Sequence, residues 1–219
     1  MARGSASVSW LRDVTPDVPT SSPRFCMSEV SGRLVELSGS GASAVLTAAT
    51  KLILDAQRML EPVAWVGTDE SSFFPPDVAQ SGVDLSALVV VRIPTAEAKR
   101  PITSMLAVAA ERLLRSGAFG LVLIDFGHAD PARKEPALNQ SLQSRLLGLA
   151  QRHQAAVLFM TEKAEESASL GSLISLRAHV GRTWLGRERF VCELRVRKDK
   201  RRGPIWSERE ECRGPLGLR

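Results

Sequence analysis

Five short apolar runs separated by helical patterns constrain the fold of this chain more than any other feature of its sequence. The runs are apolar almost throughout, which is typical of parallel strands covered on both faces of a sheet. The segments between them repeat apolar residues at helical spacing, as Leu106, Ala110 and Leu114 do. The expected strands are residues 34–38, 62–67, 88–92, 121–126 and 155–161, and the expected helices are 43–60, 76–81, 102–116 and 138–153. This alternation predicts right-handed βαβ units and an α/β fold with a mainly parallel sheet flanked by helices.

The pattern changes after about residue 170. The stretches LISLRAHVGRTWL and RFVCELRVRK are typical of strands, and in the second one Phe190, Cys192, Leu194 and Val196 alternate with polar positions. GPIWSERE is a candidate for a third strand. We therefore expect a C-terminal antiparallel extension at the edge of the parallel sheet.

The length of 219 residues favours one domain. Prolines at positions 16, 19 and 23 among Ser and Thr indicate an irregular N-terminal arm over residues 1–28, followed by a single core domain over residues 29–219. No run of about 18 apolar residues occurs, so no membrane contact is expected. The first residues lack the apolar segment of a secretion signal, and the three cysteines have no metal-binding spacing. A cytoplasmic location with reduced thiols is the resulting expectation.

A glycine-rich turn between the first expected strand and helix has the setting of a phosphate-binding loop. The motif of that loop is G-x-x-x-x-G-K-[ST]. Counted from Gly39, the lysine position holds Val45 and the metal-binding hydroxyl position holds Leu46. The sequence therefore predicts a degenerate nucleotide site, with no catalytic residue, no metal and no cofactor; its loop residues are Gly39, Ser40, Gly41 and Ser43. The alternative is that the glycines only form a tight turn between strand and helix.

A basic cluster occupies the segment from Arg195 to Gly203, which carries six basic residues and one acid, Asp199. The net charge of the whole chain is +5. Clustered cations can neutralise phosphates or attract an acidic partner. The candidate DNA- or partner-binding residues are Arg195, Arg197, Lys198, Lys200, Arg201 and Arg202. The alternative is a solvated hairpin tip without a ligand.

Several segments, taken in order, resemble the ATPase core of the bacterial recombinase RecA. They are GRLVELSG, AWVGTDE, PPDVAQSGVDLSALVVVR, AERLLRSGAFGLVLIDFG, VLFMTEK, SLRAHVGR and LRVRKDKRRGPIW, and together they span residues 32 to about 207. Within that superfamily the chain is similar to the ImuA family of RecA-like accessory proteins from SOS mutagenesis cassettes. The C-terminal sequence CRGPLGLR, residues 212–219, contributes to this similarity. The resemblance implies a RecA-like P-loop core.

The resemblance also assigns positions to individual residues. Asp125 stands where the family keeps the acid associated with Mg²⁺, and Glu70 or Asp69 where it keeps the glutamate that activates water. Glu162 replaces a glutamine that senses the γ-phosphate. Lys198 and Lys200 match a pair that reaches the nucleotide of the neighbouring subunit in a filament. With Val45 and Leu46 in the loop, Asp125 joins the degenerate site and not a catalytic one.

The function implied by the resemblance is that of a non-hydrolysing accessory protein for error-prone translesion DNA synthesis after DNA damage. Its expected partners are a Y-family-like mutagenesis polymerase homologue, RecA itself and DNA. The segment after the fifth strand, residues 164–169, is short and carries Glu165 and Glu166, so it is poorly suited to hold a phosphate backbone. Two alternatives remain open: an atypical DNA-dependent ATPase or recombinase paralogue, and a stand-alone DNA-binding module that uses the basic hairpin.

Overall fold

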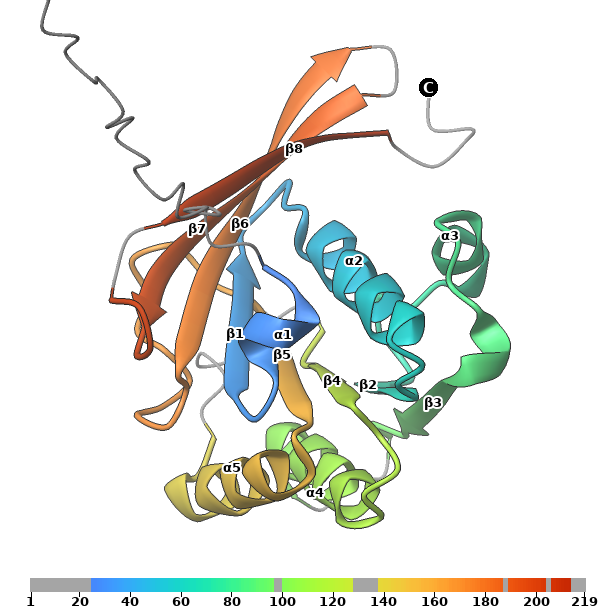
Figure 1. Cartoon of the computed structure of the whole chain (residues 1–219), viewed down its shortest axis with the longest axis vertical. Helices are drawn as coiled ribbons and strands as arrows, with labels where there is room; N and C mark the ends of the chain where they lie inside the picture. The colour runs from blue at the N-terminus through green and yellow to red at the C-terminus, as the bar shows by residue number, and fades with distance from the viewer. Residues whose placement is uncertain (1–24, 97–99, 128–137, 187–188, 204–205, 214–219) are drawn as a thin grey trace, which may run out of the picture.

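A single eight-stranded sheet forms the centre of the molecule (Figure 1). The computed structural model describes residues 25–96, 100–127, 138–186, 189–203 and 206–213. The sheet order is β3-β2-β4-β5-β1-β6-β7-β8. All pairings from β3 across to β6 are parallel, whereas β7 and β8 are antiparallel to their neighbours. The strands are β1 Leu34–Gly39, β2 Val63–Thr68, β3 Leu88–Ile93, β4 Leu121–Asp125, β5 Ala156–Glu162, β6 Leu176–Gly186, β7 Arg189–Asp199 and β8 Ser207–Arg213.

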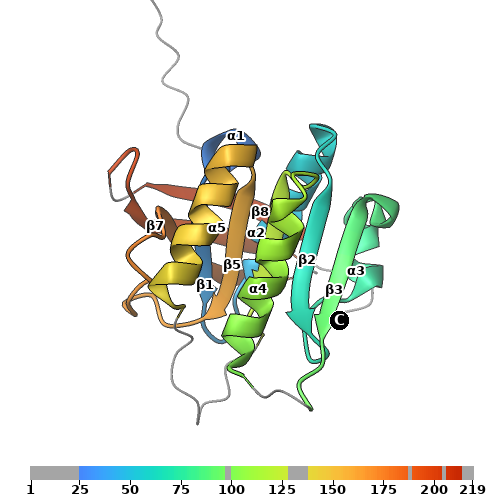
Figure 2. The ribbon, with the colours of Figure 1, turned by 90° about the horizontal axis from the view of Figure 1, so that it is seen from below.

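Helices cover the two faces of the parallel part of the sheet. Helix α2 lies on one face, and α4 and α5 lie side by side on the other, as the view from below shows (Figure 2). The helices are α1 Met27–Val30, α2 Val45–Arg58, α3 Pro75–Gln80, α4 Ile102–Arg115 and α5 Gln140–His153, with a short 3₁₀ turn η1 at Leu85–Ala87. The prediction of an α/β fold with a mainly parallel sheet and an antiparallel C-terminal extension is confirmed.

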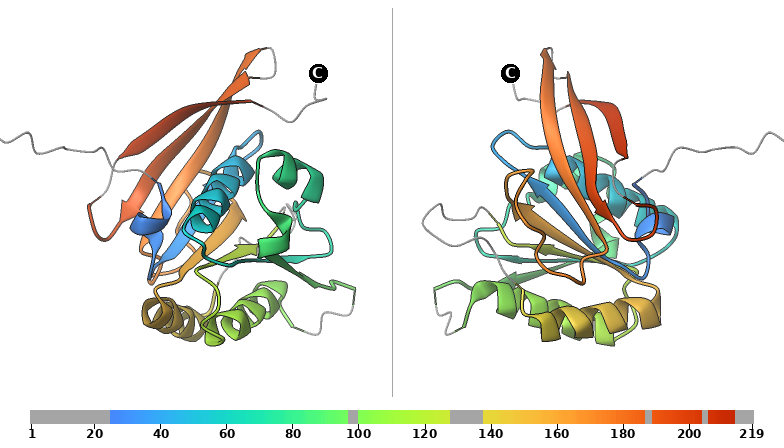
Figure 3. Two further views of the ribbon diagram at one scale, coloured as in Figure 1. Left: turned by 45° about the vertical axis from the view of Figure 1, so that its right-hand side comes forward. Right: turned by 90° about the vertical axis from the view of Figure 1, so that its left-hand side faces the viewer.

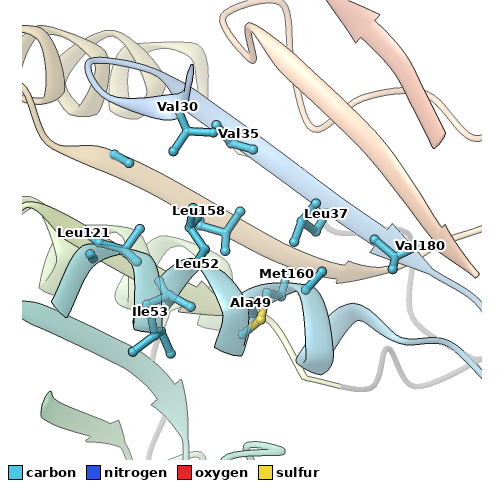
Figure 4. Close-up of a cluster of buried hydrophobic side chains, with 14 of the residues drawn as sticks. Val30, Val35, Leu37, Ala49, Leu52, Ile53, Leu121, Leu158, Met160 and Val180 are labelled. Atoms are coloured by element: carbon cyan, nitrogen blue, oxygen red, sulfur yellow. The ribbon is translucent and has the colours of Figure 1, made fainter. Parts of the chain in front are cut away.

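The larger part of the core lies between α2 and the sheet. In the close-up, Leu52 and Ile53 of α2 face the sheet, where Leu37 and Leu158 lie on the neighbouring strands β1 and β5 (Figure 4). All four side chains are 0–1% exposed. Burying one such side chain contributes about 1.5–3 kcal/mol to folding. This packing fixes the start of α2 against the carboxyl end of β1, where the glycine-rich turn lies.

Strand β3 departs from the expectation that every apolar run is covered on both faces. Val89 and Val90 are 45% and 36% exposed. The prediction was wrong at this strand because β3 lies at the end of the sheet and pairs only with β2 among the described strands. An apolar sequence alone does not distinguish a central strand from an uncovered edge strand.

The C-terminal extension projects beyond the body of the molecule as a three-stranded antiparallel ribbon (Figure 3). The alternation expected in β7 is present: Phe190, Cys192, Leu194 and Val196 are buried on the face that α2 shares. The side chains between them therefore lie on the opposite face of the ribbon, away from α2.

Helix α1 overlaps the end of the expected irregular arm, residues 1–28. Helix α1 starts at Met27, which is 3% exposed, and the Met27 amide donates to Asp55 Oδ2 at 2.6 Å. Residues 1–24 and the C-terminal segment 214–219 lie outside the described residues. None of the helices in the described part of the chain combines the length and the apolar character that crossing a membrane requires.

Candidate functional site

A cavity of about 200 Å³ lies at the carboxyl edge of the parallel strands β1, β4 and β5. Crevices at this edge are the usual ligand sites of open α/β sheets. Sites for small molecules commonly measure about 300–1,000 Å³, so this cavity is small for a nucleotide. Its lining residues are Gly39, Gly41, Ser43, Val45, Leu46, Ser72, Asp125, Gly127, Met160, Thr161 and Glu162.

The glycine-rich turn is filled by its own side chains. A methyl group added at Gly39 would meet the Val45 Cγ2 atom at 2.8 Å and the Ser43 side chain even closer. The Ser43 amide donates to the Gly41 carbonyl at 2.9 Å. Ser43 also forms an antiparallel bridge with Gly181 of β6. In a phosphate loop, consecutive amides converge on the anion; here the Ser43 amide is occupied, and Val45 takes the space above Gly39.

Asp125, at the end of β4, is held by groups of the chain itself. Its Oδ2 accepts hydrogen bonds from the Ser71 hydroxyl at 2.7 Å and the Ser72 hydroxyl at 2.9 Å, and its Oδ1 accepts from the Gly127 amide at 2.8 Å. The carboxylate is 3% exposed. Ser71 and Ser72 were not singled out from the sequence. Their place just after β2, the neighbour of β4, was the available signal, because the carboxyl ends of adjacent parallel strands meet at one edge.

The charge of the cavity is unsuited to a triphosphate. Among the residues that the structure describes, its lining contains two acids, Asp125 and Glu162, and no Lys, Arg or His; residues 128–137, which follow Gly127, lie outside the described residues. Strand β5 separates β1 from β4, so Gly39 and Asp125 stand about two strand spacings, or roughly 10 Å, apart. The side chains that would grip phosphate and metal, a lysine and a hydroxyl at the start of α2, are Val45 and Leu46. The residues present therefore do not fit a magnesium nucleotide.

The two candidates for a water-activating acid lie outside this cavity. Asp69 accepts a hydrogen bond from the Thr95 amide at 3.2 Å. The pKa of the Asp69 carboxyl is lowered chiefly by a hydrogen bond with the Thr95 side chain, and the bond from the Thr95 amide contributes less. The Glu70 amide donates to the Thr68 hydroxyl at 3.2 Å. Asp69 and Glu70 are both exposed, and neither residue is part of the cavity lining.

The predicted basic cluster is divided by the structure into two groups. Arg195 and Arg197 both contact the Glu165 carboxylate, at 3.0 Å and 3.5 Å. Lys198 and Lys200 point to another segment and donate to backbone carbonyls of residues 171 and 172, at 3.4 Å and 2.7 Å. Burial, followed by the charge of Lys200, lowers the pKa of the Lys198 ammonium.

The turn after β7 also binds the chain itself. Arg201 donates to the backbone carbonyls of Glu29 and Ser31, and Arg202 forms an ion pair with the Glu29 carboxylate. All six candidate residues thus contact loops or α1 of the same molecule. Arg195 and Arg197 lie on the outer face of the ribbon.

Asp199, the one acid of the cluster, is a buried counter-ion. Its Oδ1 lies 2.6 Å from the Arg33 Nη2 atom, and the two side chains are 1% and 2% exposed. Asp199 also accepts from the Trp206 indole at 3.2 Å. A second buried pair joins Glu36 to Lys163 at 3.1 Å. The alternative of a solvated hairpin tip therefore does not hold for Asp199, which is 6% exposed, because a charge run in the sequence gives no information about burial.

Comparisons with known proteins do not identify a relative. No protein-family model matches the chain, and no curated protein matches it. Within the described ranges, no group of three or more His, Cys, Asp or Glu side chains is arranged to hold a metal ion. The candidate site is therefore defined by its geometry alone.

Proposed function

We propose that the chain is a RecA-like accessory protein of the ImuA family, which supports error-prone translesion synthesis in the SOS response by binding partners and does not hydrolyse ATP. The observation that carries the loss of hydrolysis is the cavity at the carboxyl edge of β1, β4 and β5. It lies at the sheet edge where a nucleotide site is expected, but it is small, its described lining has two acids and no basic side chain, and Val45 fills the space above Gly39. The proposed role as an accessory protein rests on the resemblance of several segments, taken in their order along the chain, to the RecA core.

The architecture supports this proposal at the level of the fold. A strand, a glycine-rich turn and a helix lead into a parallel sheet, and an acid stands at the end of a second buried strand. An intact sheet edge without phosphate-binding side chains preserves shape while losing the groups that stabilise the transferred charge. Such a protein would act through its surface: it would tether a Y-family-like polymerase homologue in the cytoplasm, or associate with RecA as an inactive subunit.

Two experiments test the first half of the proposal, which is that the chain does not hydrolyse ATP. A fluorescent ATP analogue titrated with and without Mg²⁺, beside a known P-loop protein, should show no saturable binding to this chain. The atypical ATPase alternative predicts turnover that is lost in Asp125→Asn, a change that keeps the shape of the residue. Equal phosphate release from the wild type and Asp125→Asn would eliminate that alternative.

The partner half is tested with purified proteins. Immobilised chain should retain the mutagenesis polymerase homologue of the same cassette, and added chain should alter RecA-driven strand exchange. If strand exchange is unchanged and no polymerase is retained, the accessory role is refuted whatever the nucleotide result.

A further inference from the structure

Arginines gather on the outer face of the β6–β8 ribbon, the face opposite α2. Along β7, burial alternates, so that Arg189, Glu193 and Arg195 point away from the buried side chains. A register shift opposite residues 177 and 178 leaves Arg197 without a partner on β6. Arg197 nevertheless reaches the same Glu165 carboxylate as Arg195, which places both guanidinium groups on the outer face.

Strand β8 extends this basic face. Arg209 lies opposite Glu193 and forms an ion pair with it at 3.3 Å, and Arg189 pairs with Glu211 at 2.8 Å. Arg213 is exposed opposite Arg189. Among the residues that the structure describes, the face therefore carries five exposed arginines, Arg189, Arg195, Arg197, Arg209 and Arg213, against three carboxylates, Glu165, Glu193 and Glu211. We call this set the arginine face.

Glu165 holds a particular position on the arginine face, because it comes from the loop after β5 and not from the ribbon. Its carboxylate bridges Arg195 and Arg197 and its side chain is 17% exposed. The loop is anchored below by Arg177, which donates to the carbonyls of Ala164 and Ser167. One carboxylate shared by two guanidinium groups has the arrangement that a phosphate adopts with arginine.

Two buried side-chain nitrogen atoms of β6 lie near this loop. Among the described residues, Arg177 Nε and His179 Nδ1 have no hydrogen-bond partner, and their side chains belong to residues that are only 5% and 7% exposed. Buried polar groups are normally paired. The Arg177 guanidinium is a cation on this side of β6 and adds to the preference of this face for anions.

We propose that the arginine face binds the backbone of nucleic acid and that Glu165 is an internal competitor which a phosphate must displace from Arg195 and Arg197. From Arg189 to Arg197 the strand rises about 27 Å, at about 3.4 Å per residue. One strand of duplex DNA advances about 3.4 Å along the helix axis per phosphate, so the row spans about eight base-pair steps and can contact those phosphates that the winding of the strand turns toward it. The inference goes beyond the proposed accessory role and does not depend on RecA or on a polymerase.

The composition of the face favours duplex backbone over the other polyanions. The described part of the arginine face presents no exposed aromatic side chain, whereas base stacking by single strands and hot spots of protein interfaces both use aromatic residues. Trp184, which is 54% exposed, lies on the face of β6 toward Phe190, and Arg182 packs over both rings. Contacts to phosphates alone predict binding without sequence preference and with strong dependence on salt.

The test uses the full chain, a fluorescent duplex of about 20 base pairs and anisotropy measured over a series of salt concentrations. The informative pair is Glu165→Gln and Glu166→Gln. Both change the same charge on the same loop, but Glu166 is exposed and has no ion pair with an arginine in the described structure. Glu165→Gln should raise affinity about three- to tenfold more than Glu166→Gln, because it alone removes the competitor.

The double variant Arg195→Gln/Arg197→Gln should change affinity for the duplex in the opposite direction to Glu165→Gln. It should lose affinity about tenfold or more and reduce the slope of log K against log[salt] by about 2, since each phosphate contact contributes about 0.9. Arg202→Gln, from the group bound to α1, serves as a control and should leave the slope unchanged. Circular dichroism checks the fold of each variant, and a gain of affinity in Glu165→Gln cannot arise from misfolding.

Four results would overturn the proposal. The first is equal affinity of the two glutamine variants, and the second is an unchanged salt slope in the double arginine variant. The third is absence of duplex binding at low salt in both the wild type and Glu165→Gln. If polyglutamate binds as tightly as the duplex at the same salt, the surface is one for acidic proteins and nucleic acid is rejected as its ligand.

Discussion

Replacing Asp199 by Asn tests whether the buried ion pair with Arg33 holds the ribbon to the body of the molecule. The substitution keeps the size of the side chain but leaves the Arg33 guanidinium without its counter-ion at 2% exposure. Removing one partner of a buried pair costs about 3–5 kcal/mol. Natural domains have only about 5–15 kcal/mol of stability, so the loss would be a large fraction of the total.

The assay is urea and thermal unfolding followed by circular dichroism. For chains of this length, each kcal/mol corresponds to about 2–4 °C in Tm, so Asp199→Asn should unfold roughly 6–20 °C lower than the wild type. Arg202→Gln breaks the exposed pair with Glu29 and should cost at most about 1 kcal/mol. Both variants remove one ion pair, so the difference between their losses of stability reports the effect of burial.

The pH dependence gives an independent check. Burial raises the pKa of Asp199, but hydrogen bonds from the Arg201 amide, Arg33 and the Trp206 indole outweigh it and lower the pKa below the ordinary value. A carboxyl group with a lowered pKa in the folded state stabilises the protein at neutral pH, and this stabilisation is lost as pH falls through the folded-state pKa. Asp199→Asn should therefore weaken the acid sensitivity of folding. The reasoning is refuted if the variant stays within 1 kcal/mol of the wild type and keeps the same acid sensitivity.

Three further predictions follow from the site and the ribbon. Gly39→Ala should destabilise the chain by about 1–3 kcal/mol in urea unfolding, because the new methyl group would overlap Ser43 and Val45; unchanged stability would show that the turn is loosely packed. The double change Val45→Lys/Leu46→Thr should produce weak, saturable binding of the fluorescent ATP analogue where the wild type has none, and equal signals from both would contradict the role of these two side chains. Burial lowers the pKa of His179, so the folded state resists protonation and stability should fall as pH drops below about 6.5; His179→Gln should remove that slope, and an identical pH profile would exclude His179 as its source.

Periodicity predicted the regular elements closely, and the reason is physical. Strand β5 was expected at 155–161 and is Ala156–Glu162, and α4 was expected at 102–116 and is Ile102–Arg115. Apolar runs buried between two layers of helices carry a strong local signal. The exposure of β3 has no such signal in the local sequence, because the order of the whole sheet decides how many neighbours a strand has.

The candidate site was predictable in composition and less so in its contacts. The sequence alone shows Val45 and Leu46 at the positions where a phosphate-binding loop has a lysine and a hydroxyl. The serines that hold Asp125 come from a loop more than fifty residues away in the chain. The division of the basic cluster likewise depends on the alternation along β7 and on which loops the turn meets, and neither is set by the charges themselves.

The two ends of the sheet differ in how they would meet a foreign strand. Five of the seven residues of β8 are charged, so an approaching backbone would have to bury those charges. Strand β3 forms the opposite edge of the sheet; its sequence is rich in valine, and the side chains of Val89 and Val90 are exposed. Charged edge strands such as β8 resist self-association, whereas exposed apolar edge strands such as β3 favour it. Concentrated preparations should therefore associate from the β3 side alone, and one lysine in place of Val90 should keep them dispersed.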